Sequence, residues 1–209
     1  MNNQQVYWNN IIKETKPEKP DYDLWLNKYD DILNESKDLP IIDLGCGWGA
    51  DTLFLIEKGY KVIACDFSKE AVKRVKKFIP SAKVMQFDML DGLPFKDKET
   101  KIVISDLSLH YFSLIDTKRI ISEIRRVLVE NGVLICRVNS VNDINYGAGQ
   151  GIQIEENFYY IDGVYKRFFD EQHINMFFED WETIYINEYS TNKYNNRNKV
   201  LWEIAVKNI

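Results

Sequence analysis

The stretch at residues 41–51, IIDLGCGWGAD, constrains the fold of this chain more than any other feature. An apolar segment runs directly into Gly45, Gly47 and Gly49, and a helical pattern follows from residue 50 to residue 58. Residues without a side chain let the backbone turn sharply and lie against a ligand. A strand, a glycine-rich turn and a helix in this order are typical of the nucleotide-type site of an open α/β sheet.

Two acidic residues bear on which ligand this turn binds. The glycine pattern also fits the dinucleotide fingerprint G-x-G-x-x-G/A, with Ala50 in the last place. Asp43 lies just before the turn, where its carboxylate would attract an ammonium group and repel a pyrophosphate. Asp66 ends the next predicted strand and can accept hydrogen bonds from two ribose hydroxyls, which both cofactor types require. Asp43 therefore favours a cationic ligand, and Asp66 does not discriminate.

Five segments, in order along the chain, resemble the motifs of class I S-adenosylmethionine (SAM)-dependent methyltransferases. They are Ile41–Thr52, Lys61–Ser68, Gln86–Met89 followed by Gly92-Leu93-Pro94-Phe95, Lys101–Phe112, and Arg126–Val138. The resemblance covers about residues 40–140 and continues more loosely toward residue 209. Around Arg167-Phe168-Phe169 and Trp181 the chain looks like the small-molecule and tellurite-resistance-type branch of this family.

Composition narrows the class of partner. The net charge of −5 argues against a nucleic-acid substrate, because phosphate binding needs a basic face. Cys46, Cys65 and Cys136 have no disulfide-framework spacing, which suggests reduced thiols and a cytoplasmic location. No apolar run reaches the roughly 18 residues of a membrane span, and residues 1–5 lack a signal-peptide pattern. We expect a small-molecule acceptor, no nucleic acid and no membrane; the oligomeric state stays open.

The alternation of strand and helix patterns from residue 40 onward predicts a parallel sheet covered on both faces. The five predicted strands are residues 40–44, 61–66, 82–87, 101–106 and 132–138. A helix before the last strand is expected to begin at Asp116 and to end at Asn131-Gly132. Alternating residues at 182–189 and 200–206, joined by a polar turn, predict an antiparallel hairpin. The resemblance implies a Rossmann-like α/β fold with seven strands in the order 3-2-1-4-5-7-6, one of them antiparallel.

We predict a single domain over residues 1–209, made of four parts. They are an N-terminal helical lid (1–36), a cofactor-binding core (37–138), a substrate-side insertion (139–169), and a C-terminal helix with a β-hairpin (170–209). Asp162-Gly163, flanked by aromatic runs, predicts a hairpin within the insertion. The lid and the insertion attach at the sheet edge where ligands bind, so both are candidates to close the site.

The resemblance also implies which residues contact the cofactor. The residues that would border the methionine part of SAM are Asp43, Gly45, Cys46, Gly47 and Gly49. Those that would contact the adenosine part are Asp66, Phe67, Asp88 and Met89. Those that would pass beneath the donor sulfur are Ser105, Asp106 and Leu107. No cluster of histidine or cysteine has the spacing of metal ligands, so we expect no metal.

The sequence constrains the residues that would contact the methyl acceptor less closely than those that would contact the cofactor. His110 and Tyr111 follow the fourth strand, where a neutral imidazole could accept a proton from the nucleophile. A structural role for His110 is the alternative, and His173 is expected at the surface. Aromatic residues that could wall the donor pocket are Tyr7, Trp8 and Tyr22, and those that could line an acceptor pocket are Tyr146, Tyr159 and Tyr160. Ordinary core packing is the alternative for all six.

The expected activity is methyl transfer from SAM to a small molecule by in-line displacement, with S-adenosylhomocysteine (SAH) as product. This reaction needs positioning and exclusion of water more than a reactive side chain. Residues 105–108 read Ser-Asp-Leu-Ser, where amino-methylating relatives carry Asn/Asp-Pro-Pro-Tyr, which counts against DNA-base amines and glutamine side chains as acceptors. An NAD(P)-dependent oxidoreductase and a non-catalytic SAM-binding module are the alternatives.

Overall fold

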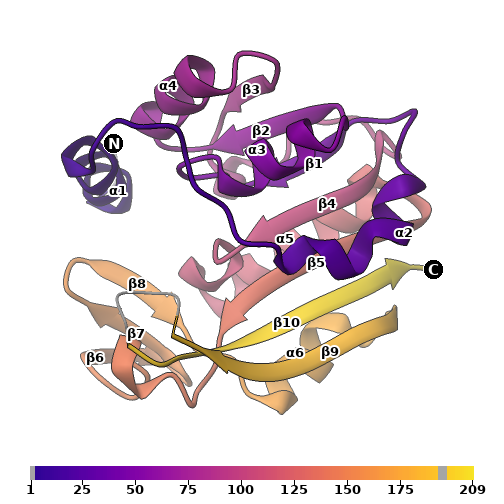
Figure 1. Cartoon of the computed structure of the whole chain (residues 1–209). Coiled ribbons are helices and arrows are strands. Elements are labelled where there is room, and N and C mark those ends of the chain that lie inside the picture. Colours follow the sequence, from indigo (N-terminus) through magenta and orange to yellow (C-terminus); the bar gives the residue numbers. More distant parts are fainter. Residues whose placement is uncertain (1–2, 193–196) are drawn as a thin grey trace.

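The centre of the structure is a seven-stranded sheet (Figure 1). The computed structural model describes residues 3–192 and 197–209, so part of the polar turn of the predicted hairpin, residues 193–196, lies outside the described residues. The strands of this sheet are β1 (Ile41–Leu44), β2 (Val62–Asp66), β3 (Lys83–Gln86), β4 (Thr100–Asp106), β5 (Leu128–Asn139), β9 (Trp181–Thr191) and β10 (Lys199–Asn208).

The strand order confirms the expected topology. The sheet runs β3-β2-β1-β4-β5-β10-β9, and β10 pairs antiparallel with both β5 and β9. Counted within this sheet alone, β9 and β10 are the sixth and seventh strands, so the order is 3-2-1-4-5-7-6. The labels differ because three strands of a second sheet intervene in the sequence. Consequently the carboxyl ends of β1, β2 and β4 lie along one edge of the sheet.

Helices cover both faces of the sheet, which explains why its central strands are apolar throughout. The helices that pack on the sheet are α3 (Ala50–Glu57), α4 (Lys69–Phe78), α5 (Leu114–Val127) and α6 (Glu171–Phe178). On one face Ile42 and Leu44 pack with the buried residues of α5 and α6. On the other face Ile41 packs with Phe54 and Leu55 of α3. Alternate residues of one strand therefore belong to two different cores.

The bounds of α5 differ from the expectation. Ser113 caps the helix, because its hydroxyl accepts a hydrogen bond from the backbone N–H of Asp116, which lies in the first turn. The helix ends at Val127 and β5 begins at once. The carbonyls of Arg126 and Val127 accept hydrogen bonds from the backbone of residues 98 and 99, so tertiary pairing ends the helix before Asn131-Gly132. These two residues lie instead within β5.

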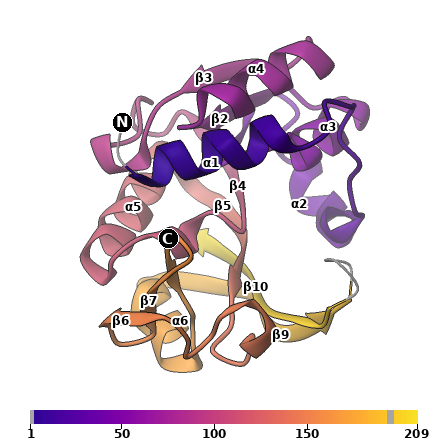
Figure 2. The ribbon, with the colours of Figure 1, turned by 90° about the vertical axis from the view of Figure 1, so that its left-hand side faces the viewer.

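The N-terminal segment crosses the ligand-binding edge of the sheet (Figure 2). Its elements are α1 (Asn3–Glu14), the 3-10 helix η1 (Trp25–Tyr29) and α2 (Asp30–Asn34). The Gln5 side-chain amide donates to the Phe67 carbonyl at 2.9 Å, and the Asn9 side-chain oxygen accepts from the Ser68 hydroxyl at 2.7 Å. These contacts hold α1 beside the turn that follows β2. No helix among the described residues is long and apolar enough to cross a membrane.

The segment after β5 forms a separate antiparallel sheet, β6-β7-β8, on the same side of the molecule as α1 (Figure 1). Its parts are the short 3-10 helix η4 (Ile144–Tyr146), β6 (Ile152–Glu155), β7 (Phe158–Ile161) and β8 (Val164–Arg167). Asp162 and Gly163 both have positive φ angles, 49° and 92°, in the turn between β7 and β8. The Asp-Gly hairpin expected from the sequence is therefore present. Two more 3-10 helices, η2 (Met89–Asp91) and η3 (Leu109–Tyr111), follow β3 and β4.

Candidate active site

A cavity of about 1210 Å³ lies at the carboxyl ends of β1, β2 and β4, between this edge, α1 and the β6-β7-β8 sheet. The expected cofactor residues that line it are Asp43, Gly45, Cys46, Gly47, Asp66, Phe67, Asp88, Met89, Asp106 and Leu107. Gly49 and Ser105 do not line it. The structure thus brings side chains from four separate strand ends to one place, as the fold class predicts.

The three glycines of the turn have different roles. A Cβ atom on Gly45 would lie 2.4 Å from the Ser108 Cβ, so this position is needed for packing against the segment after β4. A Cβ on Gly49 would lie 2.9 Å from side-chain atoms of Ile79 and Val75, so this glycine lets α3 approach α4. A Cβ atom placed on Gly47 would have no neighbouring atom within 4 Å, and the backbone of Gly47 lines the cavity.

This difference predicts a stability contrast between two alanine variants. Gly49→Ala should lower the free energy of unfolding by at least about 2 kcal/mol, because a left-handed backbone and a steric overlap both oppose the new Cβ. Gly47→Ala should lower the free energy of unfolding by only about 1 kcal/mol, because the left-handed backbone opposes the new Cβ but no neighbouring atom overlaps with it. Urea unfolding of the two variants measures the contrast, and equal losses would contradict the assigned roles.

Asp66 joins the glycine turn to the end of β2. Its Oδ2 accepts a hydrogen bond from the Gly47 N–H at 2.9 Å, and its Oδ1 accepts from the Ser68 N–H at 2.8 Å. Burial raises the pKa of this carboxyl to about 6. Each carboxylate oxygen can accept a further hydrogen bond, so the side chain can also receive donors from a ligand in the cavity.

Asp43 and Asp51 are buried beside the turn. The Thr52 hydroxyl donates to Asp43, whose pKa is raised to about 7 by burial and then by the nearby Asp106 and Asp66 carboxylates. The Trp25 indole N–H donates to Asp51 Oδ1 at 2.9 Å. Burial, followed by the charges of Asp106 and Asp43, raises the pKa of Asp51 well above its usual value. Both side chains line the cavity and resist ionisation without a cation.

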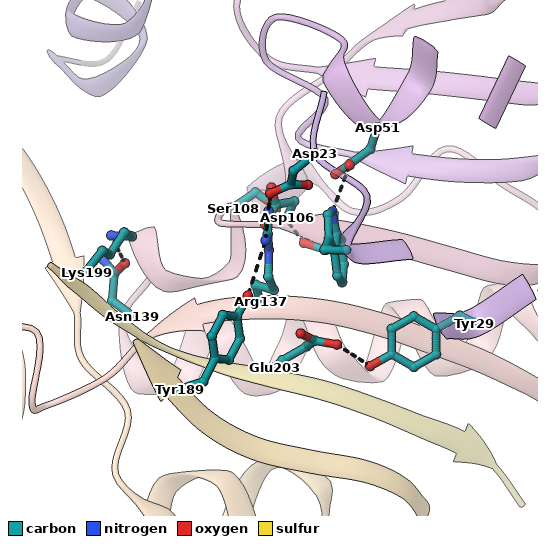
Figure 3. Close-up of polar contacts among 12 residues, drawn as sticks. Asp23, Tyr29, Asp51, Asp106, Ser108, Arg137, Asn139, Tyr189, Lys199 and Glu203 are labelled. Carbon is teal, nitrogen blue, oxygen red and sulfur yellow. Dashed lines mark hydrogen bonds and ion pairs between the residues drawn. The ribbon is translucent and has the colours of Figure 1, made fainter. Parts of the chain in front are cut away.

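Arg137 of β5 pairs with Asp106 and Asp23, and its charge also acts on Asp51 (Figure 3). Its Nε and Nη2 donate to the two carboxylate oxygens of Asp106 at 2.6 and 2.7 Å. Its Nη1 donates to Asp23 and to the Tyr189 hydroxyl, both at 3.3 Å. The guanidinium lies 4.3 Å from the centre of the Trp25 ring.

Four residues at this site were not expected there from the sequence: Arg137, Asp51, Asp23 and Trp25. A signal for Arg137 was present, since a charged residue inside an otherwise apolar strand requires a buried partner. Arg137 pairs in register with Asp106 at the end of β4. A parallel alignment of the fourth and fifth strands would have suggested this pair.

The residues present fit SAM. Arg137 pairs with Asp106 and Asp23, and a cationic ligand would in addition favour the ionised forms of Asp43 and Asp51, which a pyrophosphate would disfavour. The adjoining part of the cavity is lined by Phe67, Met89 and Leu90, which can pack against a flat base. Along the chain Gly47, whose backbone is open to the cavity, lies between Asp43 and Asp51.

The two candidate catalytic residues lie in different surroundings. Tyr111 lines the cavity, packs edge-on against Trp8 with ring centres 5.2 Å apart, and has a pKa raised first by burial. His110 does not line the cavity and is only 2% exposed. Burial and then Lys199 and Lys166 lower its pKa well below the usual value, so it is neutral at pH 7. His173, expected at the surface, is instead buried against Asp170, the residue that caps α6.

The aromatic candidates divide in a similar way. Tyr7, Trp8 and Tyr146 line the cavity. The Tyr22 side chain lies outside it, where its hydroxyl donates to Glu57 at 2.6 Å. Tyr159 packs against Phe168, and Tyr160 packs against Tyr165. Two residues that the sequence analysis did not name, Phe158 and Tyr165, line the cavity from the small sheet.

Comparisons with known proteins match the part of the chain that contains most of this cavity's strand ends. Residues 42–136 match the family profile described as "Methyltransferase domain". An uncharacterized methyltransferase of Synechocystis is 33% identical over 93 residues, which are 44% of this chain and 43% of that protein. O-methyltransferase 3 of Dictyostelium discoideum is 27% identical over 85% of this chain and 44% of its own length. The aligned parts thus span less than half the length of these relatives.

The fold comparison reaches further along the chain. A solved structure of a SAM-dependent methyltransferase from Methanosarcina mazei superposes with a TM-score of 0.76 and 19% identity, covering 91% of this chain and 99% of that one. At this identity the superposition concerns the fold. Residues 42–136 thus match a methyltransferase domain, and the strand order and the superposition show that the chain has the fold of SAM-dependent methyltransferases.

Proposed function

We propose that this protein binds SAM in the cavity and transfers the methyl group to a small-molecule acceptor. The observation that carries the proposal is a group of three carboxyls around a glycine turn whose backbone is open to the cavity: the buried Asp43 and Asp51 and the half-buried Asp66. The same group would repel the pyrophosphate of NAD(P), which speaks against an oxidoreductase.

The chain's residues would hold and neutralise the donor. When bound, SAM would supply a methyl group on a positively charged sulfur, which leaves as the neutral thioether of SAH when an electron pair of the acceptor takes the methyl group. Asp43 and Asp51 would offset the positive charge of the donor, and Asp66 would accept from the ribose hydroxyls. Trp8 of α1 and Tyr165 of β8 would exclude water from the reaction.

Several features support a small acceptor. The cavity is enclosed by α1 on one side and by the β6-β7-β8 sheet on the other, so an acceptor must enter between them. A phenol with a raised pKa, as at Tyr111, stays protonated at neutral pH and can donate a hydrogen bond to the acceptor. A general base is not required when the acceptor arrives ionised.

Titration calorimetry with SAM, SAH and NADPH tests the donor assignment. We expect SAM and SAH to bind and NADPH not to bind. Asp66→Ala should weaken both SAM and SAH by about 1–3 kcal/mol, because ribose hydroxyls lose their acceptor. Asp180→Ala, which removes an exposed carboxylate outside the cavity, is the matched control and should bind as the unchanged protein does.

The outcomes separate the alternatives. NADPH binding, or no binding of SAM and SAH, would exclude the proposed function. Binding of SAM without turnover across an acceptor panel would indicate a non-catalytic SAM-binding module instead. Circular dichroism of Asp66→Ala checks the fold, because the same carboxylate also accepts from the Gly47 N–H.

A further inference from the structure

The basic side chains that line the cavity are already bound by other groups of the chain. Arg137 pairs with Asp106 and Asp23 (Figure 3). The Lys199 ammonium pairs with Asp143, which has no exposed surface. An anionic ligand would have to compete with these carboxylates for either cation.

Two further basic side chains line the cavity beside the N-terminal segment. The Lys19 ammonium lies 2.8 Å from a carboxylate oxygen of Glu57. The Arg74 guanidinium donates to the backbone carbonyls of Lys16 and Glu18 at 2.9 and 3.2 Å. All four basic groups are therefore held by oxygen atoms of the chain itself.

Carboxyls are more numerous than basic groups along the cavity. Asp43, Asp51 and Asp66 accept hydrogen bonds from uncharged donors, which are a hydroxyl, an indole N–H and a backbone N–H. Beside the small sheet the cavity is lined by Glu155 of β6 and Asp116 of α5, which pair with arginines outside it. This lining suits positively charged and neutral ligands better than anions.

Aromatic rings from α1, η3 and the small sheet also line the cavity. Trp8 packs edge-on against Tyr7 and Tyr111, with ring centres 5.3 and 5.2 Å apart. Phe158 and Tyr165 stack with centres 5.6 Å apart at an interplanar angle of 23°. All five rings line the cavity. Such surfaces suit a flat ring system, and the negative faces of the rings attract a cation.

The charge of the lining discriminates between kinds of methyl acceptor. When the acceptor is uncharged, the positive charge of the donor passes to the acceptor and stays in the cavity. When the acceptor is an anion, the charge is cancelled. Nearby carboxyls stabilise the positive charge throughout the first reaction. In the second they stabilise the donor complex more than the transition state, which lowers the rate.

A pyridine-type ring nitrogen meets these requirements. It belongs to a flat ring, stays unprotonated at pH 7 and keeps an electron pair in the ring plane. An aliphatic amine is protonated at pH 7, as the lysine side chain is, and then has no electron pair to offer.

We propose that the methyl acceptor is an uncharged aromatic heterocycle, and that its ring nitrogen takes the methyl group between the aromatic walls of the cavity. This assignment rests on the proposed function, because it names the acceptor class of the same cavity. The electron pair of the nitrogen forms the new bond to carbon, the carbon–sulfur bond breaks with its electrons left on sulfur, and the positive charge moves from sulfur to nitrogen. No proton moves in this step, so it needs no general base.

The test titrates protein saturated with SAH with ring cations and their uncharged isosteres. The pairs are 1-methylpyridinium and toluene, 1-(2-hydroxyethyl)pyridinium and 2-phenylethanol, and 2-methylisoquinolinium and 2-methylnaphthalene. Each pair differs in charge and little in shape. We expect at least one cation to bind about tenfold or more tightly than its isostere. When SAM replaces SAH, this preference should fall by about threefold or more, because the sulfonium already supplies the positive charge.

Variants of the lining locate the effect. Trp8→Leu should reduce the preference by about threefold, and Trp8→Phe should retain more of it, because a phenyl ring still presents an aromatic face. Asp116→Asn neutralises a carboxylate that lines the cavity and should reduce the preference by about twofold. Asp180→Asn makes the same change in net charge at an exposed position outside the cavity and should leave the preference unaltered. Melting temperatures check the fold of each variant.

The outcomes separate this assignment from the proposed function. If SAH binds but no cation is preferred over its isostere, the acceptor assignment is wrong. It is also wrong if the preference is equal in the SAM and SAH complexes or unaltered in Trp8→Leu, because the cation would then bind away from the reacting sulfur or from the aromatic walls. A failure to bind SAH would instead overturn the proposed function.

Discussion

Replacing Arg137 with methionine is expected to lower the free energy of unfolding by about 3–5 kcal/mol, the cost of leaving buried charges without their partner. The guanidinium is 3% exposed and makes two short hydrogen bonds to Asp106. It also donates to Asp23, and its charge acts on the buried Asp51. Methionine matches much of its length and contributes none of these interactions.

Urea unfolding measures this loss of stability. Two further variants show whether it comes from the buried charges. Arg119→Met removes an arginine whose side chain is 54% exposed and paired with Asp116, so it should cost about 1 kcal/mol or less. The double variant Arg137→Met/Asp106→Asn should recover part of the loss, because it also removes the stranded charge. A double variant no more stable than Arg137→Met alone would show that packing against Trp25, not charge, makes Arg137 important.

The sheet could be predicted because its signals are local and repeated. Each central strand is a short apolar run between helical patterns, and such runs form parallel sheets with both faces covered. The acids at the ends of β1 and β2 and the glycines between them lie within single motifs, so their meeting at one edge follows from the topology. All three features are visible without knowledge of long-range contacts.

The parts that could not be predicted depend on contacts between distant segments. Asn131-Gly132 is a strong local stop signal for a helix, but pairing of residues 98 and 99 with residues 126 and 127 ends α5 earlier. Arg137, besides its in-register partner Asp106, also contacts Asp23, which lies 114 positions away in the sequence. The local motifs of a single sequence do not reveal these contacts, because the paired residues lie far apart along the chain.

Aromatic runs show a second limit. Residues 158–160 read Phe-Tyr-Tyr, and a strand presents alternate residues on opposite faces, but the sequence does not reveal which face borders the cavity. The structure places Phe158 at the cavity and Tyr159 against Phe168. The surface position expected for His173 was wrong for a related reason, because its burial follows from its packing against Phe169, outside the helix, and against Phe177 within α6.

The affinity for SAM is expected to rise steeply with pH between 5 and 7. Asp43, with a pKa of about 7, and Asp66, with a pKa of about 6, are partly protonated in this range, whereas a cationic ligand favours their ionised forms. If the bound state requires ionised Asp43, this residue alone contributes about a 50-fold increase in affinity between pH 5 and pH 7. Asp66 adds to the effect at the lower end of the range.

The stability of the ligand-free protein should change in the opposite direction. A carboxyl whose folded-state pKa lies above its unfolded value binds more protons when folded, so its contribution is complete below about pH 4. For Asp43 that contribution is lost as pH rises through about 7, and for Asp66 as it rises through about 6. Between pH 4 and 7 these two residues make the free protein less stable while SAM binding becomes tighter.

Calorimetric titrations of SAM at pH 5, 6 and 7, in buffers of different ionisation enthalpy, measure both the affinity and the protons released. Asp43→Asn keeps an acceptor for the Thr52 hydroxyl but cannot ionise, so it should bind SAM more weakly at pH 7 and lose most of the pH dependence. SAH lacks the positive sulfur and should show a smaller slope than SAM in the unchanged protein. A SAM affinity that is constant from pH 5 to 7, or an Asp43→Asn variant with an unaltered slope, would mean that the buried carboxyls do not neutralise the donor.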